Sequence, residues 1–203
     1  MQLHLNATSP FARVARIVAL EKGLQNQLEL CWSDPWADPA ELLRANPVGR
    51  IPVLITNAGT TIAESLLIAQ YLDAQSATPA LLPADALAAV LEQTGRGYGL
   101  MEAAFSTVIH RKHEGADADQ SLLGQRRQQA IERTIAALGA AHPSVPGDVN
   151  QQPVDLGQIV VAVALDYVCF RLPEINWQTA YPALSAWHQA FTQRISFTDT
   201  AFA

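Results

Sequence analysis

A serine at the start of a predicted helix is the side chain whose type and position best suit it to chemistry. Residues 8–13 read T-S-P-F-A-R, between a predicted strand at residues 1–5 and a predicted helix at residues 11–20. Ser9 is a candidate N-cap, and Pro10 is a favourable first helical residue. A hydroxyl there lies beside free N–H groups and the positive end of the helix, which stabilise an anion such as a thiolate. The alternative is that Ser9 only caps the helix.

A second segment, residues 46–54, predicts a turn followed by a strand that is entered through proline. It reads N-P-V-G-R-I-P-V-L, and because proline cannot donate to a sheet ladder, Pro52 belongs at the start or edge of the strand. A tight turn is also a reasonable place for a cis bond between Ile51 and Pro52. A cis proline leaves the backbone N–H and C=O of the preceding residue free to pair with an extended peptide. Ile51 is therefore a candidate ligand-binding residue.

The third candidate is the sequence A-E-S at residues 63–65, which opens a predicted helix after a hairpin turn at residues 57–59. It places the Glu64 carboxylate and the Ser65 hydroxyl at a helix N-terminus, a position that also favours a ligand carboxylate. Both residues have structural alternatives. Glu64 can be the third helical residue of a capping box with Thr61, in T-I-A-E, and Ser65 a simple helix-start residue.

The predicted elements follow one another as strand, helix, strand, short helix, strand, strand and helix, which is the thioredoxin-like order. With the motifs at these positions, the chain resembles the glutathione transferase superfamily over essentially its whole length. S-P-F-A-R is similar to the C-P-F-A segment of the omega class with serine in place of cysteine, and to the glutaredoxin C-P-F-C with both thiols replaced. N-P-V-G-R-I-P-V-L and E-S-L-L-I-A-Q-Y-L-D are similar to the N-P-x-G-K-V-P-V-L and E-S-x-x-I-x-x-Y-L patterns of many classes. The resemblance is to a bacterial, serine-type member.

The resemblance implies an α/β thioredoxin-like N-terminal domain followed by an all-α helical-bundle C-terminal domain, the glutathione transferase architecture. The first domain, residues 1–77, binds glutathione, and the second, residues 84–203, contributes an electrophile pocket and dimer contacts. Pro79 and Pro83 break helical continuity between the two. Strand signals cease beyond this boundary, and helical patterns occupy residues 86–113, 121–141, 153–172 and 182–193, with a loop at 142–152.

The helix predicted from residue 153 is so apolar that it should form the centre of the second domain. Members of the superfamily usually start this helix with a Ser/Thr-x-x-Asp capping box. Here the cap position is expected at Gln152, and only Asp155 of that box remains. The helix is therefore expected without the usual cap geometry.

The resemblance also implies a role for each candidate residue. Ile51 pairs through its backbone with the cysteinyl part of glutathione. Ser65 and its helix N-terminus hold the γ-glutamyl carboxylate, and Glu64 binds the ammonium group. Ser9 is the catalytic residue, since it donates a hydrogen bond to the sulfur. A free thiol has a pKa of about 8.5, so a lowering by a unit or two makes the thiolate common at neutral pH.

Four further residues near these motifs have two interpretations each. Phe11 is a candidate glutathione-binding residue that flanks the thiol, or it fills the core. Arg50 is a candidate for the glycyl end of glutathione, or it lies at the surface. Arg13 and Arg16, one turn inside the first helix, are expected to face solvent or a partner subunit.

The long helix predicted from residue 86 carries candidates for the electrophile pocket. Tyr98, Met101 and Phe105 follow one another at spacings of three and four, which places them on one helix face. That face borders the cleft in this superfamily, while ordinary helix packing is the alternative interpretation of the same stripe. His110 and His113 have the spacing of a metal pair, but no third ligand is evident, so we expect no metal.

Composition limits the classes of function. The net charge is −6 with no run of like charges, so the basic face that nucleic-acid binding needs is not visible. Cys31 and Cys169 each lie in an apolar stretch and are expected in the core, consistent with a reducing cytoplasm. The longest apolar run, residues 159–165, is too short to span a membrane, and no signal peptide is indicated. We expect a cytoplasmic protein without nucleic-acid or membrane partners.

Two classes of function stay open. The first is a glutathione transferase that uses glutathione as co-substrate, attacks a small hydrophobic electrophile and serves detoxification. The serine at position 9 argues against omega-like thiol transfer, which needs a cysteine for a mixed disulfide. The second is a non-catalytic scaffold or stress-response interaction protein of the same fold, since fold alone does not imply function. The resemblance also implies a homodimer.

Overall fold

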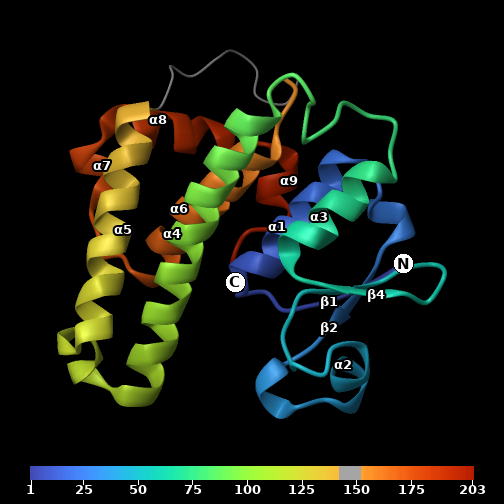
Figure 1. The fold of residues 1–203 in the computed structure, drawn as a ribbon, viewed down its shortest axis with the longest axis horizontal. Coiled ribbons are helices and arrows are strands. Elements are labelled where there is room, and N and C mark those ends of the chain that lie inside the picture. The colour runs from blue at the N-terminus through green and yellow to red at the C-terminus, as the bar shows by residue number, and fades with distance from the viewer. Residues whose placement is uncertain (142–151) are drawn as a thin grey trace. The chain divides into compact units, whose positions relative to one another are not determined.

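A computed structural model describes residues 1–141 and 152–203 of the chain. The structure falls into two compact units, which are described separately (Figure 1). The first unit is Met1–Leu87 together with Asp199–Ala203, and the second is Ala88–Thr198. The last five residues therefore group with the first unit, although the sequence places them in the second domain. The loop predicted at 142–152 lies, apart from Gln152, outside the described residues.

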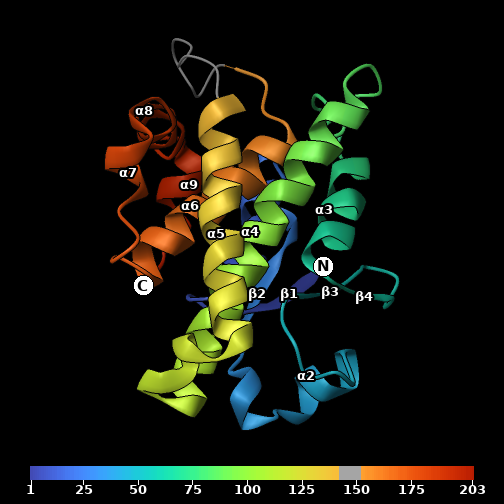
Figure 2. The ribbon, with the colours of Figure 1, turned by 60° about the vertical axis from the view of Figure 1, so that its left-hand side comes forward.

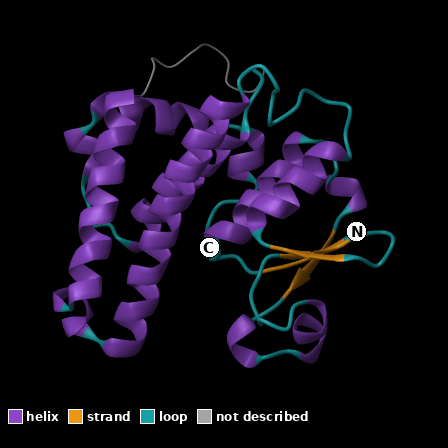
Figure 3. Cartoon of the chain, viewed as in Figure 1, coloured by secondary structure: helices purple, strands orange, loops and turns teal. Residues whose placement is uncertain are grey.

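The first unit is built on a mixed four-stranded sheet (Figure 3). Its strand order is β2-β1-β3-β4, with β1 parallel to β2 and antiparallel to β3, and with β3 antiparallel to β4. This is the thioredoxin-like arrangement, as predicted. The strands are β1 (Gln2–Leu5), β2 (Glu29–Trp32), β3 (Val53–Ile55) and β4 (Thr61–Ala63).

Helices cover both faces of this sheet, with α1 and α3 on one side and α2 on the other (Figures 1 and 3). The α1 face of the core is apolar at helical spacing, and Val14, Ile17 and Val18 are fully buried. Each such side chain contributes about 1.5–3 kcal/mol through burial. The helical segments are α1 (Pro10–Glu21), the 3-10 turns η1 (Gln25–Gln27) and η2 (Pro35–Ala37), α2 (Ala40–Ala45) and α3 (Ser65–Ala74).

The second unit is helical throughout its described residues, as predicted (Figure 2). α4 and α5 are the arms of a helical hairpin whose tip is the 3-10 segment η3. α6 is buried along most of its length and forms the centre of the unit, because nearly all of its residues are apolar. The elements are α4 (Leu87–Glu114), η3 (Ala116–Gln120), α5 (Leu122–Ala141), α6 (Leu156–Arg171), α7 (Trp177–Ala180), α8 (Pro182–Phe191) and α9 (Ile195–Thr198).

The start of α6 corrects the expectation that the cap lies at Gln152. The helix begins at Leu156, and its N-cap is Asp155. The Asp155 carboxylate accepts from the Gln158 N–H at 2.8 Å, and the Gln158 side-chain oxygen accepts from the Asp155 N–H at 3.1 Å. D-L-G-Q is thus a complete capping box that satisfies both N–H groups. Burial raises the pKa of the Asp155 carboxyl, which its hydrogen bonds from the Gln158 and Gly157 N–H groups partly offset.

One glycine allows α4 to approach α6 closely. A Cβ at Gly97 would lie 2.8 Å from the backbone nitrogen of Val161 and 3.0 Å from the carbonyl carbon of Val160. Gly95 and Gly99, on the same helix, would place a Cβ in open space. Of these three positions, only Gly97 depends on the missing side chain for packing.

We expect Gly97→Ala to lower the free energy of unfolding by about 1–3 kcal/mol, because the methyl group overlaps backbone atoms that cannot rotate away. The matched controls are Gly95→Ala and Gly99→Ala. Each should leave stability unchanged or raise it by up to about 1 kcal/mol through helix propensity. Urea unfolding followed by circular dichroism measures all three variants. Equal stabilities would contradict the close approach of the two helices.

Candidate functional site

Ser9 caps α1, as predicted, with Pro10 as the first helical residue. Its hydroxyl oxygen accepts from the Ala12 N–H at 3.2 Å, and the residue is 7% exposed. A serine hydroxyl has two acceptor positions and one hydrogen of its own. The hydroxyl can therefore cap the helix and still donate its hydrogen to a nearby anion.

The loop that presents Ser9 is held by Asn6. Its side-chain oxygen accepts from the backbone N–H of Ser9 at 2.8 Å and from that of Thr8 at 3.2 Å. This arrangement fixes the backbone just before the helix. Nothing in T-S-P-F-A-R points to Asn6; the signal that finds it is an asparagine three residues before an N-cap.

A second asparagine shapes the turn before β3. Asn46 is buried, its amide nitrogen donates to the Arg50 carbonyl at 3.0 Å, and its amide oxygen accepts from the Val48 N–H at 3.2 Å. Gly49 adopts φ +70°, a conformation that favours glycine. This turn delivers the chain to the Ile51–Pro52 peptide bond, which is cis, as the sequence predicts.

Ile51 is half-buried and directly precedes that bond. β3 begins only at Val53, which pairs with β1 and β4. Within residues 1–141 and 152–203, the backbone N–H and C=O of Ile51 have no hydrogen-bond partner. Both groups are therefore available to the backbone of an extended ligand.

The helix start after β4 decides between the two interpretations of Glu64. α3 begins at Ser65, and Glu64 is its N-cap residue, without a side-chain cap hydrogen bond. A capping box with Thr61 is therefore wrong, because residues 61–63 form β4 and Glu64 precedes the helix. Glu64 also adopts φ +71°, which costs a non-glycine residue about 1–3 kcal/mol. Strain of this kind occurs preferentially at ligand sites.

Ser65 carries a buried hydroxyl that lacks a hydrogen bond. The residue is 1% exposed, and its Oγ has no partner among the described residues. A buried polar atom left unsatisfied costs about 1–3 kcal/mol. The atom lies in the first turn of a helix whose N–H groups receive no side-chain cap. A ligand carboxylate at this helix end would satisfy both the hydroxyl and the N–H groups.

The sheet brings these residues to one end of the first unit. β1 and β4 run in the same direction, since each is antiparallel to β3. Consequently the chain after β1, the chain before β3 and the chain after β4 all leave the sheet at the same end. Ser9, Ile51 and Glu64–Ser65 lie in these three segments. The residues in register across the three strands are His4, Val53 and Ala63.

Known proteins similar to this chain belong to one superfamily. The family model of the glutathione S-transferase N-terminal domain matches residues 8–75. The uncharacterized GST-like protein YibF of Escherichia coli strain K12 is 30% identical over 202 residues, which is 98% of each chain. The chain belongs to the glutathione S-transferase superfamily.

Solved structures of this superfamily superpose on the whole chain. A glutathione transferase family member from Pseudomonas fluorescens Pf-5, with bound glutathione, has a TM-score of 0.88 at 29% identity and covers 100% of this chain and 98% of its own. A glutathione S-transferase from Methylobacillus flagellatus KT, also with glutathione bound, has a TM-score of 0.85 at 27% identity and covers 100% and 99%. The fold assignment therefore rests on both sequence and structure.

The remaining predicted residues of this glutathione S-transferase chain lie as follows. Phe11 is half-buried, and the Arg50 side chain is exposed. In α4, Tyr98 and Phe105 are half-buried and Met101 is fully buried, so helix packing is the better interpretation of Met101. These last three residues belong to the second unit.

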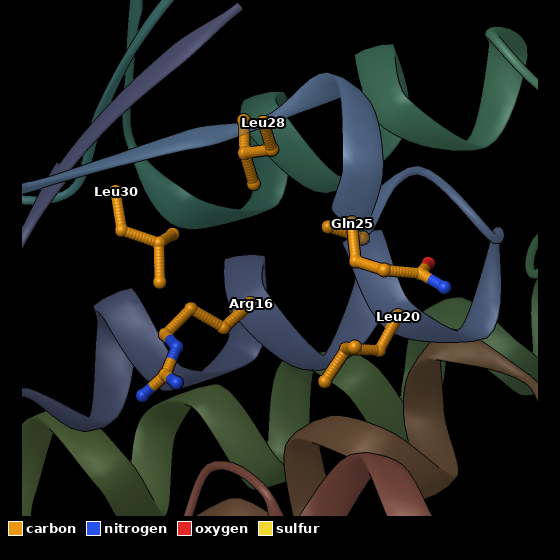
Figure 4. A pocket seen from close by; sticks show the side chains of 6 residues that line it. Arg16, Leu20, Gln25, Leu28 and Leu30 are labelled. Atoms are coloured by element: carbon orange, nitrogen blue, oxygen red, sulfur yellow. The ribbon is translucent and has the colours of Figure 1, made fainter.

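A shallow pocket lies in the first unit, between α1 and the segment from η1 to β2 (Figure 4). Its floor is mostly aliphatic, and the leucine side chains of the strand side point toward the helix. None of the predicted site residues lines it. The lining residues are Arg16, Ala19, Leu20, Gln25, Leu28 and Leu30.

The two cysteines and His110 are other potentially reactive side chains, and each lies in surroundings that suit a structural role. Cys31 and Cys169 are half-buried free thiols, and burial raises the pKa of both, which disfavours the reactive thiolate. His110 lies between Glu114 at 2.8 Å and Arg127 at 2.6 Å. Among the residues that the structure describes, no three His, Cys, Asp or Glu side chains group as metal ligands. No helix in that part of the chain is both long and apolar enough to cross a bilayer.

Proposed function

We propose that this protein is a glutathione transferase that stabilises the glutathione thiolate at Ser9 for attack on a small hydrophobic electrophile. The observation that carries the proposal is the buried Ser65 hydroxyl, which has no hydrogen-bond partner among residues 1–141 and 152–203, at the uncapped start of α3. This group lies at the same end of the sheet as Ser9. A ligand with an anionic head and a thiol some distance away fits both groups, and two similar solved structures hold glutathione.

Glutathione is an extended anionic tripeptide, and the proposed site meets each of its parts. Ser65 and the α3 N-terminus bind the γ-glutamyl carboxylate. The Glu64 carboxylate binds the adjacent ammonium group. The backbone of Ile51 pairs with the cysteinyl residue, which directs the thiol toward Ser9. Arg50, whose guanidinium is exposed, reaches the glycyl carboxylate.

The proposed chemistry needs only a modest electrostatic effect. One hydrogen bond from Ser9 and the positive end of α1 together stabilise the thiolate anion by about 2–3 kcal/mol. This lowers the thiol pKa from about 8.5 by a unit or two, which makes thiolate abundant at neutral pH. The thiolate then forms a carbon–sulfur bond with the electrophile. In a substitution, the carbon–leaving-group bond breaks and its electron pair departs with the displaced group. In an addition, the π electron pair moves to the neighbouring carbon, which then takes a proton. Phe11 flanks the sulfur in this proposal.

The wider organisation belongs to the same proposal. Residues 1–77 form the glutathione-binding domain, and residues 84–203 contribute the electrophile pocket, with Tyr98 and Phe105 as its candidate lining and Met101 behind them. We further propose a cytoplasmic homodimer that acts in detoxification. Size-exclusion chromatography with light scattering tests the dimer, and a monomer at micromolar concentration would contradict it.

Calorimetric titration with reduced glutathione at neutral pH tests the site. We expect wild-type protein to bind, and Ser65→Ala to bind about tenfold more weakly, because a hydrogen bond to the charged carboxylate is lost. The same substitution should leave the melting temperature unchanged or raise it, since the buried hydroxyl has no partner to lose. Ser76→Ala, just after the end of α3, is the matched control and should leave the affinity unchanged; its hydroxyl makes only exposed hydrogen bonds to Thr78, at 3.2 and 3.4 Å, so the melting temperature should fall slightly at most.

Each outcome of the titration has a clear meaning. An affinity that is unchanged by Ser65→Ala would place the carboxylate elsewhere. Absence of binding to wild-type protein would contradict the transferase proposal and favour the non-catalytic scaffold.

A further inference from the structure

α1 carries two arginines, Arg13 and Arg16, that the proposed chemistry does not use. The sequence predicts that both face solvent or a partner subunit, and for Arg13 this is wrong, because the residue is only 4% exposed. A buried guanidinium needs compensating partners, since transfer of a charge out of water is costly. The partners that bury Arg13 and hold Arg16 include the opposite end of the chain.

The C-terminal strap, residues 199–203, makes contact with both arginines within the first unit. The Arg13 Nε donates to the Thr200 hydroxyl at 3.4 Å, and the Arg13 guanidinium lies 4.4 Å from the centre of the Phe202 ring. The Arg16 guanidinium donates to the Asp199 carbonyl at 3.3 Å. Thr200 is 2% exposed and Phe202 is half-buried, so these two side chains pack into the unit (Figure 1), while the other three residues of the strap are exposed.

The strap is attached at the turn of α1 that presents Ser9. Arg13 follows Ser9 by four residues, and its backbone N–H donates to the Ser9 carbonyl at 3.0 Å. The contacts of the Arg13 side chain therefore influence the position of the first turn of the helix. The two arginines also repel each other: burial first, and then the Arg13 charge, lower the pKa of Arg16. Without the strap, two neighbouring cations would lose acceptors that now hold them in place.

We propose that the C-terminal strap is a positioning device that fixes the first turn of α1, with Arg13, Thr200 and Phe202 as its positioning residues. It keeps the Ser9 hydroxyl and the positive end of the helix directed at the reacting sulfur. The proposal rests on the proposed function for the identity of that sulfur. The contacts themselves are independent of any ligand, and they can be tested without one.

The test uses a thiol introduced at the helix start by Ser9→Cys. A cysteine at a helix N-terminus has a lowered pKa, which the pH dependence of its alkylation by iodoacetamide reports without any glutathione. We expect Phe202→Leu, added to Ser9→Cys, to raise that thiol pKa by about 0.5–1 unit. At a pH below the pKa, the fraction of thiolate should then fall about 3- to 10-fold. Leucine keeps apolar bulk and removes the aromatic face. Thr200→Val, which keeps the shape and removes the acceptor, should act in the same direction.

The control is a chain that ends at Phe202 and so lacks only Ala203, which is exposed. It should alkylate like the parent Ser9→Cys protein. In the background with Ser9, Phe202→Leu should likewise raise the pKa of the bound glutathione thiol while glutathione affinity stays within about threefold.

The possible outcomes distinguish the strap proposal from the proposed transferase function. A lower melting temperature with an unchanged thiol pKa in Phe202→Leu and Thr200→Val would make the strap merely structural and overturn the proposal. A raised thiol pKa in the introduced cysteine supports the strap even if wild-type protein binds no glutathione. The absence of glutathione binding would then count against the proposed function and not against the strap.

Discussion

Lys22→Ala should lower the free energy of unfolding by about 3–5 kcal/mol, the usual cost of breaking a buried ion pair from one side. Lys22 is 2% exposed, and its ammonium group lies 2.9 Å from the Asp73 carboxylate. It also donates to the carbonyls of Thr78 at 3.1 Å and Pro79 at 3.0 Å. All three of its hydrogens are thereby used. Alanine would leave a largely buried carboxylate and two carbonyls without their donor.

The position of Lys22 explains why one side chain matters so much. It is the C-cap residue of α1, Asp73 is near the end of α3, and residues 78–79 belong to the chain that leaves α3. Asp73 also accepts from the Leu81 N–H at 2.9 Å. The ion pair therefore joins the two helices that cover one face of the sheet to the segment that leads out of the unit.

Urea unfolding measures this effect, with an unchanged m-value as evidence that the folded state keeps its compactness. Arg96→Ala is the control, because Arg96 pairs with Glu92 on an exposed face of α4 and should change stability by less than about 1 kcal/mol. The double variant Lys22→Met and Asp73→Leu should recover part of the loss, since apolar residues often replace a buried pair at little cost. A loss below about 1 kcal/mol in Lys22→Ala would show that water reaches the pair.

The parts of the fold that follow from local chemistry were predictable. Ser9-Pro10 is a helix start by its own residue types, and the proline after Ile51 marks a strand entrance. The superfamily pattern misplaced the cap of α6 at Gln152, although D-x-x-Q before an apolar run identifies Asp155 by itself. Local chemistry thus predicted better here than the family pattern.

Long-range packing accounts for the rest. The burial of Arg13 depends on Thr200 and Phe202, which lie nearly the whole chain away, and no helical period reports such partners. The sequence around Glu64 allows two interpretations, and the structure decides between them because the three residues before Glu64 form β4. In both cases the deciding information was which segment of the chain pairs with which, and a single sequence does not contain it directly.

Ser9→Ala should raise the pKa of the bound glutathione thiol by about 1 unit, because the positive end of α1 remains, and so lower turnover near pH 6.5 by up to about tenfold. The reason is that, in the proposed site, the thiolate loses the hydrogen bond from Ser9. Glutathione affinity should stay within a few-fold, because the contacts proposed for Ile51, Glu64 and Ser65 do not involve Ser9. The absorbance of the bound thiolate against pH and the pH–rate profile measure the two effects separately.

Ser9 also caps α1, so Ser9→Ala has a second effect, on stability, that needs its own control. Alanine removes the acceptor for the Ala12 N–H and should cost about 0.5–2 kcal/mol of stability as well. Ser9→Gly removes the donor without adding a charge, and glycine is almost as good a cap as serine. If Ser9 acts on the sulfur, the glycine variant is nearly as stable as wild type and yet raises the thiol pKa as much as alanine does. If Ser9 only caps the helix, Ser9→Gly keeps the wild-type profile, and Thr8 or the backbone N–H of Phe11 then becomes the donor to test.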